Sequence, residues 1–553
     1  QPGSTGLPRS HVGHPSAIDD HTGSATPSAS SGATIDMDLS DLQKIRRQKV
    51  ETFRQRGIEP YPTRAARTHT TTEAIDRFDA AEANGTLDGD ATAETVTLAG
   101  RIVSFRHMGK TVFAHIRDGF GQLQLYIRKD LVGDDVYADI LKLYDLGDFV
   151  QASGRLFRTR TGEVSLRVTS IGMLSKALNA PPEKWHGVQD IELRYRQRYV
   201  DLIANAEVRR VFEIRSKTVT ALREFLDSHG YLEVETPTLQ PLYGGAAARP
   251  FTTHHNSLDQ TFYLRIADEL YLKRLLVGGF ERVYEIAKDF RNEGIDKNHS
   301  PEFTMLEFYE AYSDYDQMMT FVEQMIAHAV RAVHGGSTFS FQGNEIDVTP
   351  PWPRKTLRQA IIEGCGIDYT QYPDQESLTA IAREKGADIE MGTVWPRVVD
   401  ELLKQFVRPF QIQPIFLTDY PVALSPLAKR KLDDPTHVER FQPYIGGGEI
   451  GNAFTELNDP LDQLARFLEQ QVDREAGDEE AMPIDEDFVN ALMYGMPPTG
   501  GVGIGIDRLT MLLADQSTLR DVILFPAMRR LPNRGETAPA EETAGAEVTE
   551  PVS

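Results

Sequence analysis

Residues 281–309 read ERVYEIAKDFRNEGIDKNHSPEFTMLEFY. The apolar segments at the two ends predict strands, and the polar middle, NEGIDKNHSP, predicts the loop that joins them. Side chains alternate along a strand, so one face of the second strand carries Phe303, Met305, Glu307 and Tyr309. A charged residue in a central strand is costly unless it is paired. This face is therefore expected to line a site rather than a core.

Two segments near the C-terminus predict further parts of that site. The first, EIGNAFTELND at 449–459, predicts a strand on which the same period aligns Asn452, Phe454 and Glu456. The second, GGVGIGIDRLTMLLAD at 500–515, passes from a glycine-rich strand into a helix. Its glycines at 501, 503 and 505 alternate and clear one face, on which a flat ring can lie. Arg508 follows at the helix start, where a cation and free N–H groups can both meet phosphate.

Helical patterns precede and separate these strands. Residues 207–229 predict a long amphipathic helix that ends at Gly230 and leads into the strand YLEVETP, which Pro237 closes. Further helical stretches occur within 315–410.

Composition limits the class of protein. The chain has 553 residues, of which 40% are hydrophobic and 25% charged, as in globular proteins of two or three domains. No apolar stretch reaches the roughly 18 residues of a membrane span. The single cysteine, Cys365, excludes a disulfide framework within the chain and favours a reducing compartment, the cytoplasm. The net charge of −23 argues against non-specific coating of nucleic acid.

The N-terminal region begins with a low-complexity segment. Residues 1–37 are rich in Gly, Ser, Pro and Thr and predict disorder, with Met37 as the expected start of translation. Residues 38–94 predict a helical segment that opens with an amphipathic helix, whose apolar stripe is Leu39, Leu42, Ile45, Val50 and Phe53. Its other face is basic and either solvated or in contact with RNA phosphates: Lys44, Arg46, Arg47, Lys49, Arg54 and Arg56.

Residues 95–176 predict a small barrel. Short alternating segments separated by glycine-containing turns, with one helical connection, fit an OB-type barrel better than a sandwich. Between Val96 and Lys176 there are 12 Lys and Arg against 8 Asp and Glu, so this part of an acidic chain is basic. OB folds hold single-stranded bases by stacking and phosphate attraction. A barrel with an ordinary charged surface is the alternative.

The strand–loop–strand, the glycine-rich strand and the helix–strand together resemble motifs 2, 3 and 1 of class II aminoacyl-tRNA synthetases. The resemblance runs from about Asp38 to Pro532 and is closest to the lysyl members of the aspartyl/asparaginyl/lysyl subclass. The segments that carry it are FRNEGIDKNHSPEFTMLEFYEAY, PLYGGAAARPFTTHHNSLDQTFYLRIADELYLKRL, GGGEIGNAFTELND and GVGIGIDRLTMLL.

The resemblance implies an α+β multidomain protein. An N-terminal OB-fold would read the anticodon, and a catalytic domain at 207–533 would hold an antiparallel sheet flanked by helices, with a helical insertion at about 315–410. A linker at 177–206 and a disordered acidic tail at 534–553 complete the expected organisation. A homodimer through motif 1 is also implied.

The activity implied is the ATP-dependent ligation of L-lysine to the 3′ end of tRNA(Lys), through lysyl-adenylate. Arg291 and Arg508 would act on the phosphates. The remaining ATP contacts implied are Glu293, His299, Phe303, Gly503 and Gly505. The lysine pocket implied comprises Gly245, Glu269, Glu307, Tyr309, Asn452, Phe454 and Glu456. In it, Glu269 would take the α-ammonium, and Glu456 with Tyr309 the ε-ammonium.

Magnesium is the implied metal, with Glu449 as its ligand. Gln442 stands where the family usually offers a second carboxylate, and an amide oxygen coordinates more weakly. Glu449 also has the opposite strand parity to Asn452, so a bulge near Gly451 is predicted. On the barrel, the implied anticodon contacts are Arg101, Phe113, Gln124 and Glu163.

Three alternative functions remain open at this point. A lysine ligase that modifies a protein would share the pocket but usually lacks the barrel. An aspartyl- or asparaginyl-specific relative would not place acids at 269, 307 and 456. An RNA-binding protein with an inactive synthetase core would lack one of Arg291, Arg508 or Glu269, and the chain has all three.

Overall fold

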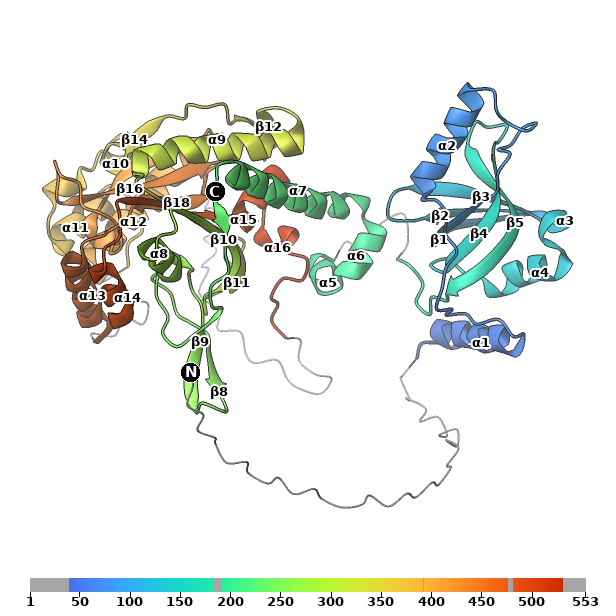
Figure 1. Ribbon diagram of the computed structural model, residues 1–553, viewed down its shortest axis with the longest axis horizontal. Coiled ribbons are helices and arrows are strands. Elements are labelled where there is room, and N and C mark those ends of the chain that lie inside the picture. The colour runs from blue at the N-terminus through green and yellow to red at the C-terminus, as the bar shows by residue number, and fades with distance from the viewer. Residues whose placement is uncertain (1–38, 183–189, 391, 476–480, 531–553) are drawn as a thin grey trace, which may run out of the picture. The chain divides into compact units, whose positions relative to one another are not determined.

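The computed structural model describes residues 39–182, 190–390, 392–475 and 481–530 (Figure 1). The predicted disordered ends, 1–37 and 534–553, fall outside these ranges. The chain divides into two compact units between Pro181 and Pro182. The predicted linker, 177–206, is helical over α5 (Ile191–Arg196) and α6 (Arg198–Ala204). Arg198 in α6 is buried, and its guanidinium donates to the carbonyl oxygens of Leu524 at 3.1 Å and Arg520 at 2.9 Å, which fixes this part of the segment in the second unit.

The first unit is a closed barrel with the strand order β1–β2–β3–β5–β4. Strands β3 and β5 pair in parallel, and β1 closes the ring against β4. The interior is apolar, with Leu98, Leu125 and Leu166 fully buried. The predicted OB-type barrel is thus confirmed. Its elements are α1 (Asp41–Gln55), α2 (Thr71–Ala83), β1 (Val96–Met108), β2 (Thr111–Arg117), β3 (Gln122–Arg128), α3 (Lys129–Val132), α4 (Asp134–Leu143), β4 (Phe149–Arg158) and β5 (Val164–Ser175).

Helix α1 packs differently from its predicted apolar stripe. Val50 and Phe53 are buried, whereas Leu42 and Ile45 are exposed. Arg46, predicted on the outer face, is buried instead, and its guanidinium donates to the carbonyl oxygens of Ala177 and Asn179, at 2.9 Å each. A buried guanidinium needs such acceptors, so the chain that follows β5 decides which face of α1 turns inward. Arg46 therefore does not belong to a surface for RNA phosphates.

The second unit is built on a mixed sheet with the order β14–β15–β16–β18–β19–β11–β10–β6, to which β17 adds beside β16. Its central pairs are antiparallel, as expected, while the outer pairs β14–β15 and β10–β6 are parallel. The strands are β6 (Leu232–Glu233), β10 (Arg282–Phe290), β11 (Glu302–Ala311), β14 (Arg354–Thr356), β15 (Ile415–Pro421), β16 (His437–Ile445), β17 (Gly448–Glu449), β18 (Gly451–Thr455) and β19 (Thr499–Gly505). Two small sheets join β12 (Thr338–Phe341) with β13 (Asn344–Asp347), and β7 (Leu239–Gln240) with β9 (Gln260–Leu264) and β8 (Thr252–His255).

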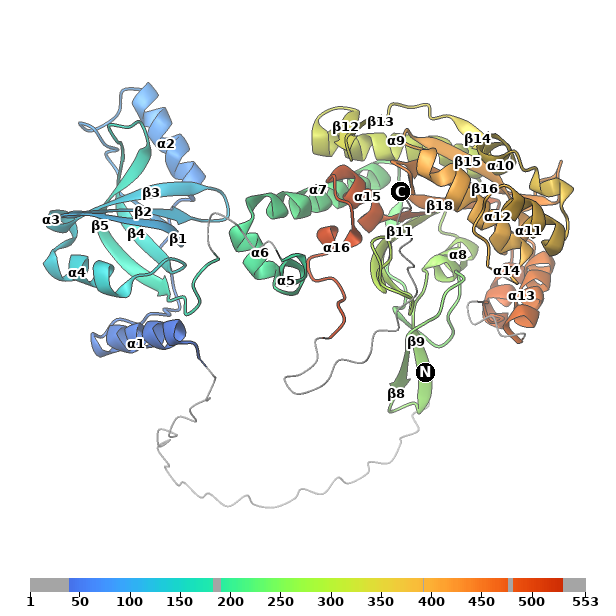
Figure 2. The same cartoon turned by 180° about the vertical axis from the view of Figure 1, so that it is seen from behind.

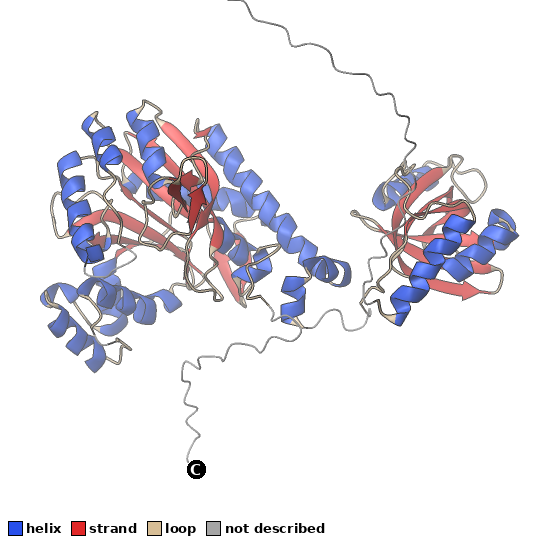
Figure 3. Cartoon of the chain, turned by 90° about the horizontal axis from the view of Figure 1, so that it is seen from below, coloured by secondary structure: helices blue, strands red, loops and turns tan. Residues whose placement is uncertain are grey.

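Alternation along the central strands separates the two faces of this sheet. On β11, Leu306 and Phe308 are fully buried in a core that includes residues of α7 and α9, which lie side by side (Figures 1 and 2). Glu307 and Tyr309, which alternate with these two residues along the strand, turn to the other face. Helices flank the sheet, as expected (Figure 3). They are α7 (Ala206–Ser228), α8 (Glu269–Val277), α9 (Tyr315–His334), α10 (Leu357–Cys365), α11 (Gln375–Glu384), α12 (Trp395–Leu402), α13 (Pro460–Glu475), α14 (Glu486–Met493), α15 (Ile506–Leu513) and α16 (Leu519–Val522).

The expected helical insertion at 315–410 is partly integral to the fold. Helix α9 belongs to the main core, and β14 extends the main sheet. Helices α10, α11 and α12 gather around β15 and β16 in a second apolar cluster. A hairpin, β12–β13, also lies in this range, so the segment is not wholly helical.

Candidate active site

A cavity of about 460 Å³ lies on the sheet face opposite α7 and α9, with β19 as its floor. In the pairing register, Gly501 lies between Tyr309 and Phe454, and Gly503 lies between Glu307 and Asn452. A Cβ atom at Gly501 would come within 2.5 Å of the Tyr309 ring and would overlap the carboxylate of Glu456. The alternating glycines therefore leave the space that the flanking polar side chains enclose.

A change of register brings Glu449 into the same cavity. Tyr444 pairs with Glu449, whereas Phe441 pairs with Ala453, so the strand segment at 450–452 holds one residue more than its partner. The Ile450 N–H donates to Pro443 at 3.0 Å, and the Ile450 carbonyl accepts from Gly505 at 3.0 Å. This extra residue changes the strand parity, as the predicted bulge requires, and Glu449 and Asn452 both line the cavity.

One end of the cavity is acidic, and a lysine of the chain itself connects its carboxylates. Lys273 on α8 is fully buried, and its Nζ lies 2.6 Å from Glu269 Oε1. The same Nζ pairs with Glu456 Oε2, and it lies 5.4 Å from the centre of the Phe454 ring. Burial lowers the pKa of Lys273, but the two carboxylates outweigh it and leave the pKa raised. Glu269 and Glu456 therefore point into one cavity and share one ammonium.

Further buried carboxylates stand beside Glu307. The Tyr309 hydroxyl donates to Glu307 at 3.0 Å. Carboxylate oxygens of Asp268, Asp289 and Glu307 lie within 4.8 Å of one another. Burial, with the neighbouring acids, raises the pKa of Glu307 to about 8 and that of Asp268 to about 10. Arg265 lies 3.0 Å from Asp268 and 2.7 Å from Glu285 and compensates part of this charge. The acidic end therefore favours a cation that can replace protons.

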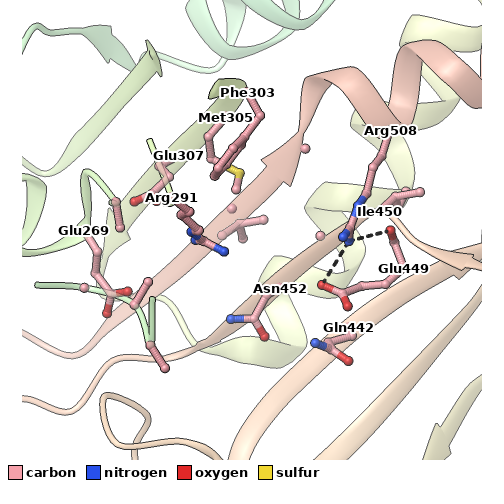
Figure 4. Close-up of a pocket in the computed structure, with 18 of the residues that line it drawn as sticks. Glu269, Arg291, Phe303, Met305, Glu307, Gln442, Glu449, Ile450, Asn452 and Arg508 are labelled. Carbon is pink, nitrogen blue, oxygen red and sulfur yellow. Dashed lines mark hydrogen bonds and ion pairs between the residues drawn. The ribbon is translucent and has the colours of Figure 1, made fainter. Parts of the chain in front are cut away.

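The opposite end carries the Arg508 guanidinium and Glu449. Arg508 Nη1 donates to the Glu449 carbonyl at 3.3 Å and lies 3.8 Å from its carboxylate. Figure 4 shows this pair at one end, Glu269 at the other, and Arg291 between them. The Arg291 guanidinium lies over the Phe303 ring, 5.0 Å from its centre. At the start of α15, Asp507 accepts from the Thr304 backbone N–H at 2.7 Å and so fixes Arg508 relative to β11.

Asn452 and Gln442 have their amide oxygens engaged. Arg440 Nε donates to Asn452 Oδ1 at 2.7 Å, which leaves the Asn452 amide N–H groups for a ligand. Gln442 Oε1 accepts from the hydroxyls of Tyr420 and Tyr444, at 2.6 and 2.8 Å. An oxygen that already accepts two hydrogen bonds is a poor metal ligand. Asp507 also lines the cavity, but Arg215 and the Thr304 backbone N–H donate to its two oxygens at 2.6 and 2.7 Å, so Glu449 is the better anionic ligand of the two.

The other residues expected around ATP and lysine also line the cavity. Gly245 has a φ of +89°, and a Cβ atom there would lie 3.2 Å from the Glu269 Cβ, so the backbone of Gly245 approaches Glu269 closely. Glu293 and His299 lie in the exposed loop between β10 and β11, where His299 Nδ1 bonds Asp296 at 2.7 Å. Gly503, Gly505 and Arg508 complete the set on β19 and α15.

The four residues expected to contact an anticodon lie on the barrel strands or their ends. Gln124 Nε2 donates to Glu163 at 2.9 Å, and His115 Nε2 bonds the other Glu163 oxygen at 2.8 Å. The Phe113 ring packs 5.2 Å from that of Tyr126 and is half-buried. Arg101 lies over the Phe149 ring and donates to the Gly147 carbonyl at 3.0 Å. Gln124, Glu163 and His115 therefore form one polar network.

All the residues predicted for ATP, lysine and metal contacts line this one cavity. Lys273, Arg440 and His115 were not predicted. Lys273 lies four residues after Glu269, a spacing that puts the two side chains on one face of a helix and was a usable signal. Arg440 and His115 meet partners distant in sequence, which no local pattern reveals.

Comparisons with known proteins match each of the two units to a protein family. Residues 190–529 match the family model of class II tRNA synthetases (D, K and N), and residues 96–174 match that of OB-fold nucleic acid binding domains. The chain is 54% identical to a lysine–tRNA ligase of Chloroflexus aurantiacus, over 89% of this chain and 99% of that protein. It is 55% identical to one of Roseiflexus castenholzii over the same shares, and 51% identical to one of Pelotomaculum thermopropionicum, over 89% of this chain and 96% of that protein.

Among the described residues, no helix has the length and apolar character needed to cross a membrane.

Proposed function

The chain belongs to the class II tRNA synthetases and acts as a lysine–tRNA ligase, and we propose how its cavity and barrel divide the work of that reaction. The observation that carries the proposal is the position of two buried carboxylates, Glu269 and Glu456, in the same cavity as Arg291 and Arg508. Acids at one end suit an amino acid with two ammonium groups. Guanidiniums suit phosphates.

The acidic end holds lysine in this proposal. Glu269 and the Gly245 carbonyl take the α-ammonium, and Glu456 with Tyr309 takes the ε-ammonium, while Phe454 contacts the aliphatic stem. The Asn452 amide, whose oxygen Arg440 holds, donates to the substrate carboxylate. Glu307 adds charge beside the α-ammonium. Neutral isosteres of lysine are rejected because they leave buried carboxylates unpaired.

The guanidinium end positions ATP. A lysine carboxylate oxygen attacks the α-phosphorus, and pyrophosphate leaves with the bonding electrons. Arg291 holds the α-phosphate and stabilises its developing charge, while Arg508 and His299 hold the distal phosphates. Phe303 stacks on the adenine and Glu293 accepts from its amino group; Gly503 and Gly505 leave room for the nucleotide. No protein nucleophile takes part, so catalysis rests on orientation and charge stabilisation.

Glu449 would hold Mg²⁺ at the nucleotide site. A single carboxylate with substrate phosphates is a common way to bind Mg²⁺, which neutralises phosphate charge when bound. Because the Gln442 amide is neutral and its oxygen already accepts from two hydroxyls, Glu449 rather than Gln442 would bind the metal.

The barrel supplies tRNA recognition. Phe113 stacks on an anticodon base, and Gln124 and Glu163 bond its edge, beside Arg101. A ribose hydroxyl at the 3′ end of tRNA(Lys) then attacks the carbonyl carbon of lysyl-adenylate, and AMP leaves.

A homodimer is proposed through the β6 edge of the main sheet. Leu232 on β6 is 49% exposed and Phe280, just before β10, is 45% exposed, and β6 is the last strand of the sheet among the residues that the structure describes. Such apolar exposure is typical of subunit interfaces. Light scattering should give the mass of a dimer, and Leu232→Glu should lower it; a native monomer would refute the interface.

We place the enzyme in the cytoplasm, where its single cysteine stays reduced.

Amino-acid-dependent ATP–pyrophosphate exchange tests the proposed function. Exchange is expected with lysine and not with aspartate or asparagine, and aminoacylation is expected with tRNA(Lys). Exchange without any charging of tRNA, combined with lysine transfer to a protein, would instead support a protein-modifying ligase. Binding of RNA without exchange would support an inactive synthetase core.

A further inference from the structure

Lys273 is a buried cation that none of the roles assigned above uses. It is fully buried on α8, with its Nζ 2.6 Å from Glu269 and paired also with Glu456. Both carboxylates line the cavity, and so does Phe454, over whose ring the ammonium lies. Lys273 therefore contacts the wall of the lysine pocket from behind, where a substrate does not reach.

The charges at the acidic end show what this cation does. Three carboxyl groups line it: Glu269, Glu307 and Glu456. Lysine brings two ammonium groups, and its own carboxylate is held outside this end by Asn452. Lys273 supplies the third cation, so the three carboxylates that line the pocket meet three ammoniums when lysine is bound, while Arg265 faces Asp268 and Asp289 behind them. Without Lys273, two buried carboxylates would face each other across the pocket wall with one charge in excess.

We propose that Lys273 is a positioning residue that determines specificity: its fixed ammonium favours the ionised forms of Glu269 and Glu456 and holds both side chains in place, so that the pocket selects an amino acid carrying two cations. This inference rests on the proposed function. Lys273 faces Glu269 on α8 and Glu456 after β18. The other charged and titratable groups around these two carboxylates are Glu307 and Tyr309 on β11 and Arg440 on β16.

The consequence is specific to the amino-acid substrate. When Lys273 loses its charge, a proton binds Glu269 or Glu456 more tightly and competes with the substrate ammonium. Lysine then binds well only at higher pH, whereas ATP, at the other end of the cavity, is held as before. A residue that merely supported the fold would weaken both substrates or neither.

Lys273→Met and Lys273→Gln test this, with Arg274→Met as the matched control. Arg274 is the next residue of α8 and pairs with Asp485 and Asp487, which do not line the cavity. Native enzyme must first show lysine-dependent exchange, since its absence would refute the proposed function itself. For the Lys273 variants, we expect the KM for lysine to rise about tenfold or more with little change in that for ATP. The acid limb of kcat/KM for lysine should also move to higher pH.

The control separates charge in the pocket from loss of any ion pair on α8. Arg274→Met should keep the lysine KM and the acid limb of the native enzyme. Lys273→Gln retains hydrogen-bond donors and similar size, so it is expected to fold and to decide the matter where Lys273→Met does not. Equal losses for lysine and ATP, or an unmoved acid limb, would overturn the inference. So would failure of Lys273→Gln to fold when Arg274→Met folds, because Lys273 would then serve stability alone.

Discussion

Glu456→Gln gives the sharpest separation of the two ends of the cavity. The Glu456 side chain is 1% exposed, and its carboxylate pairs with Lys273. The amide keeps the shape of the side chain but removes the charge that the ε-ammonium of lysine would meet. Removing one partner of a buried charge pair costs about 3–5 kcal/mol. At about 1.4 kcal/mol per tenfold, kcat/KM for lysine should fall by roughly two to three and a half orders of magnitude.

The assay is lysine-dependent ATP–pyrophosphate exchange, with lysine and ATP varied separately. The KM for ATP should change little, because Arg291 and Arg508 remain in place. Glu310→Gln is the matched control: Glu310 lies on β11 but pairs with Arg282 and Tyr231, outside the cavity. Thermal unfolding of both variants checks that they fold. Equal losses for lysine and ATP would remove Glu456 from the amino-acid pocket and refute the reasoning.

Further predictions concern the barrel, the floor and the protons of the pocket. Phe113→Ala should leave pyrophosphate exchange intact, while kcat/KM for aminoacylation falls by the factor that corresponds to the loss of about 1–3 kcal/mol of base stacking. Loss of both activities in kinetic assays would indicate a folding role instead. Gly501→Ala should abolish exchange, since its methyl group would meet Tyr309 and the Glu456 carboxylate; a crystal structure with lysine bound to an active variant would disprove this. Lysine binding should release protons and tighten as pH rises towards about 8, because an ammonium favours the ionised form of Glu307, whose pKa burial raises to about 8 in the free protein. Calorimetry in buffers of different ionisation enthalpy measures this, and proton uptake would contradict it.

Strand periodicity made most of the candidate site predictable. A period of two places Glu307 with Tyr309, and Asn452 with Glu456, and alternate glycines at 501 and 503 mark the floor between them. These positions depend only on local backbone geometry. The change of register after Glu449 was also predictable, because the strand parity of Glu449 conflicts with that of Asn452.

Features that depend on distant partners were not predictable in the same way. Arg46 turns inward because its guanidinium donates hydrogen bonds to carbonyl groups more than a hundred residues away in the sequence, and Ile45 is exposed as a result. Lys273 acquires its role only when α8 brings it to Glu456. Strand β14 has three residues, too few to show a period, although it extends the main sheet.

The additional residue at 450–452 also bears on redesign of the enzyme. Before it, Glu449 lines the cavity at the end proposed for the nucleotide; after it, Asn452, Phe454 and Glu456 line the end proposed for the amino acid. Substrate preference can therefore be re-engineered on the downstream side with the upstream contact left untouched. Shortening the chain by one position there would turn Glu449 away from the triphosphate and keep the downstream register, uncoupling recognition of lysine from its activation.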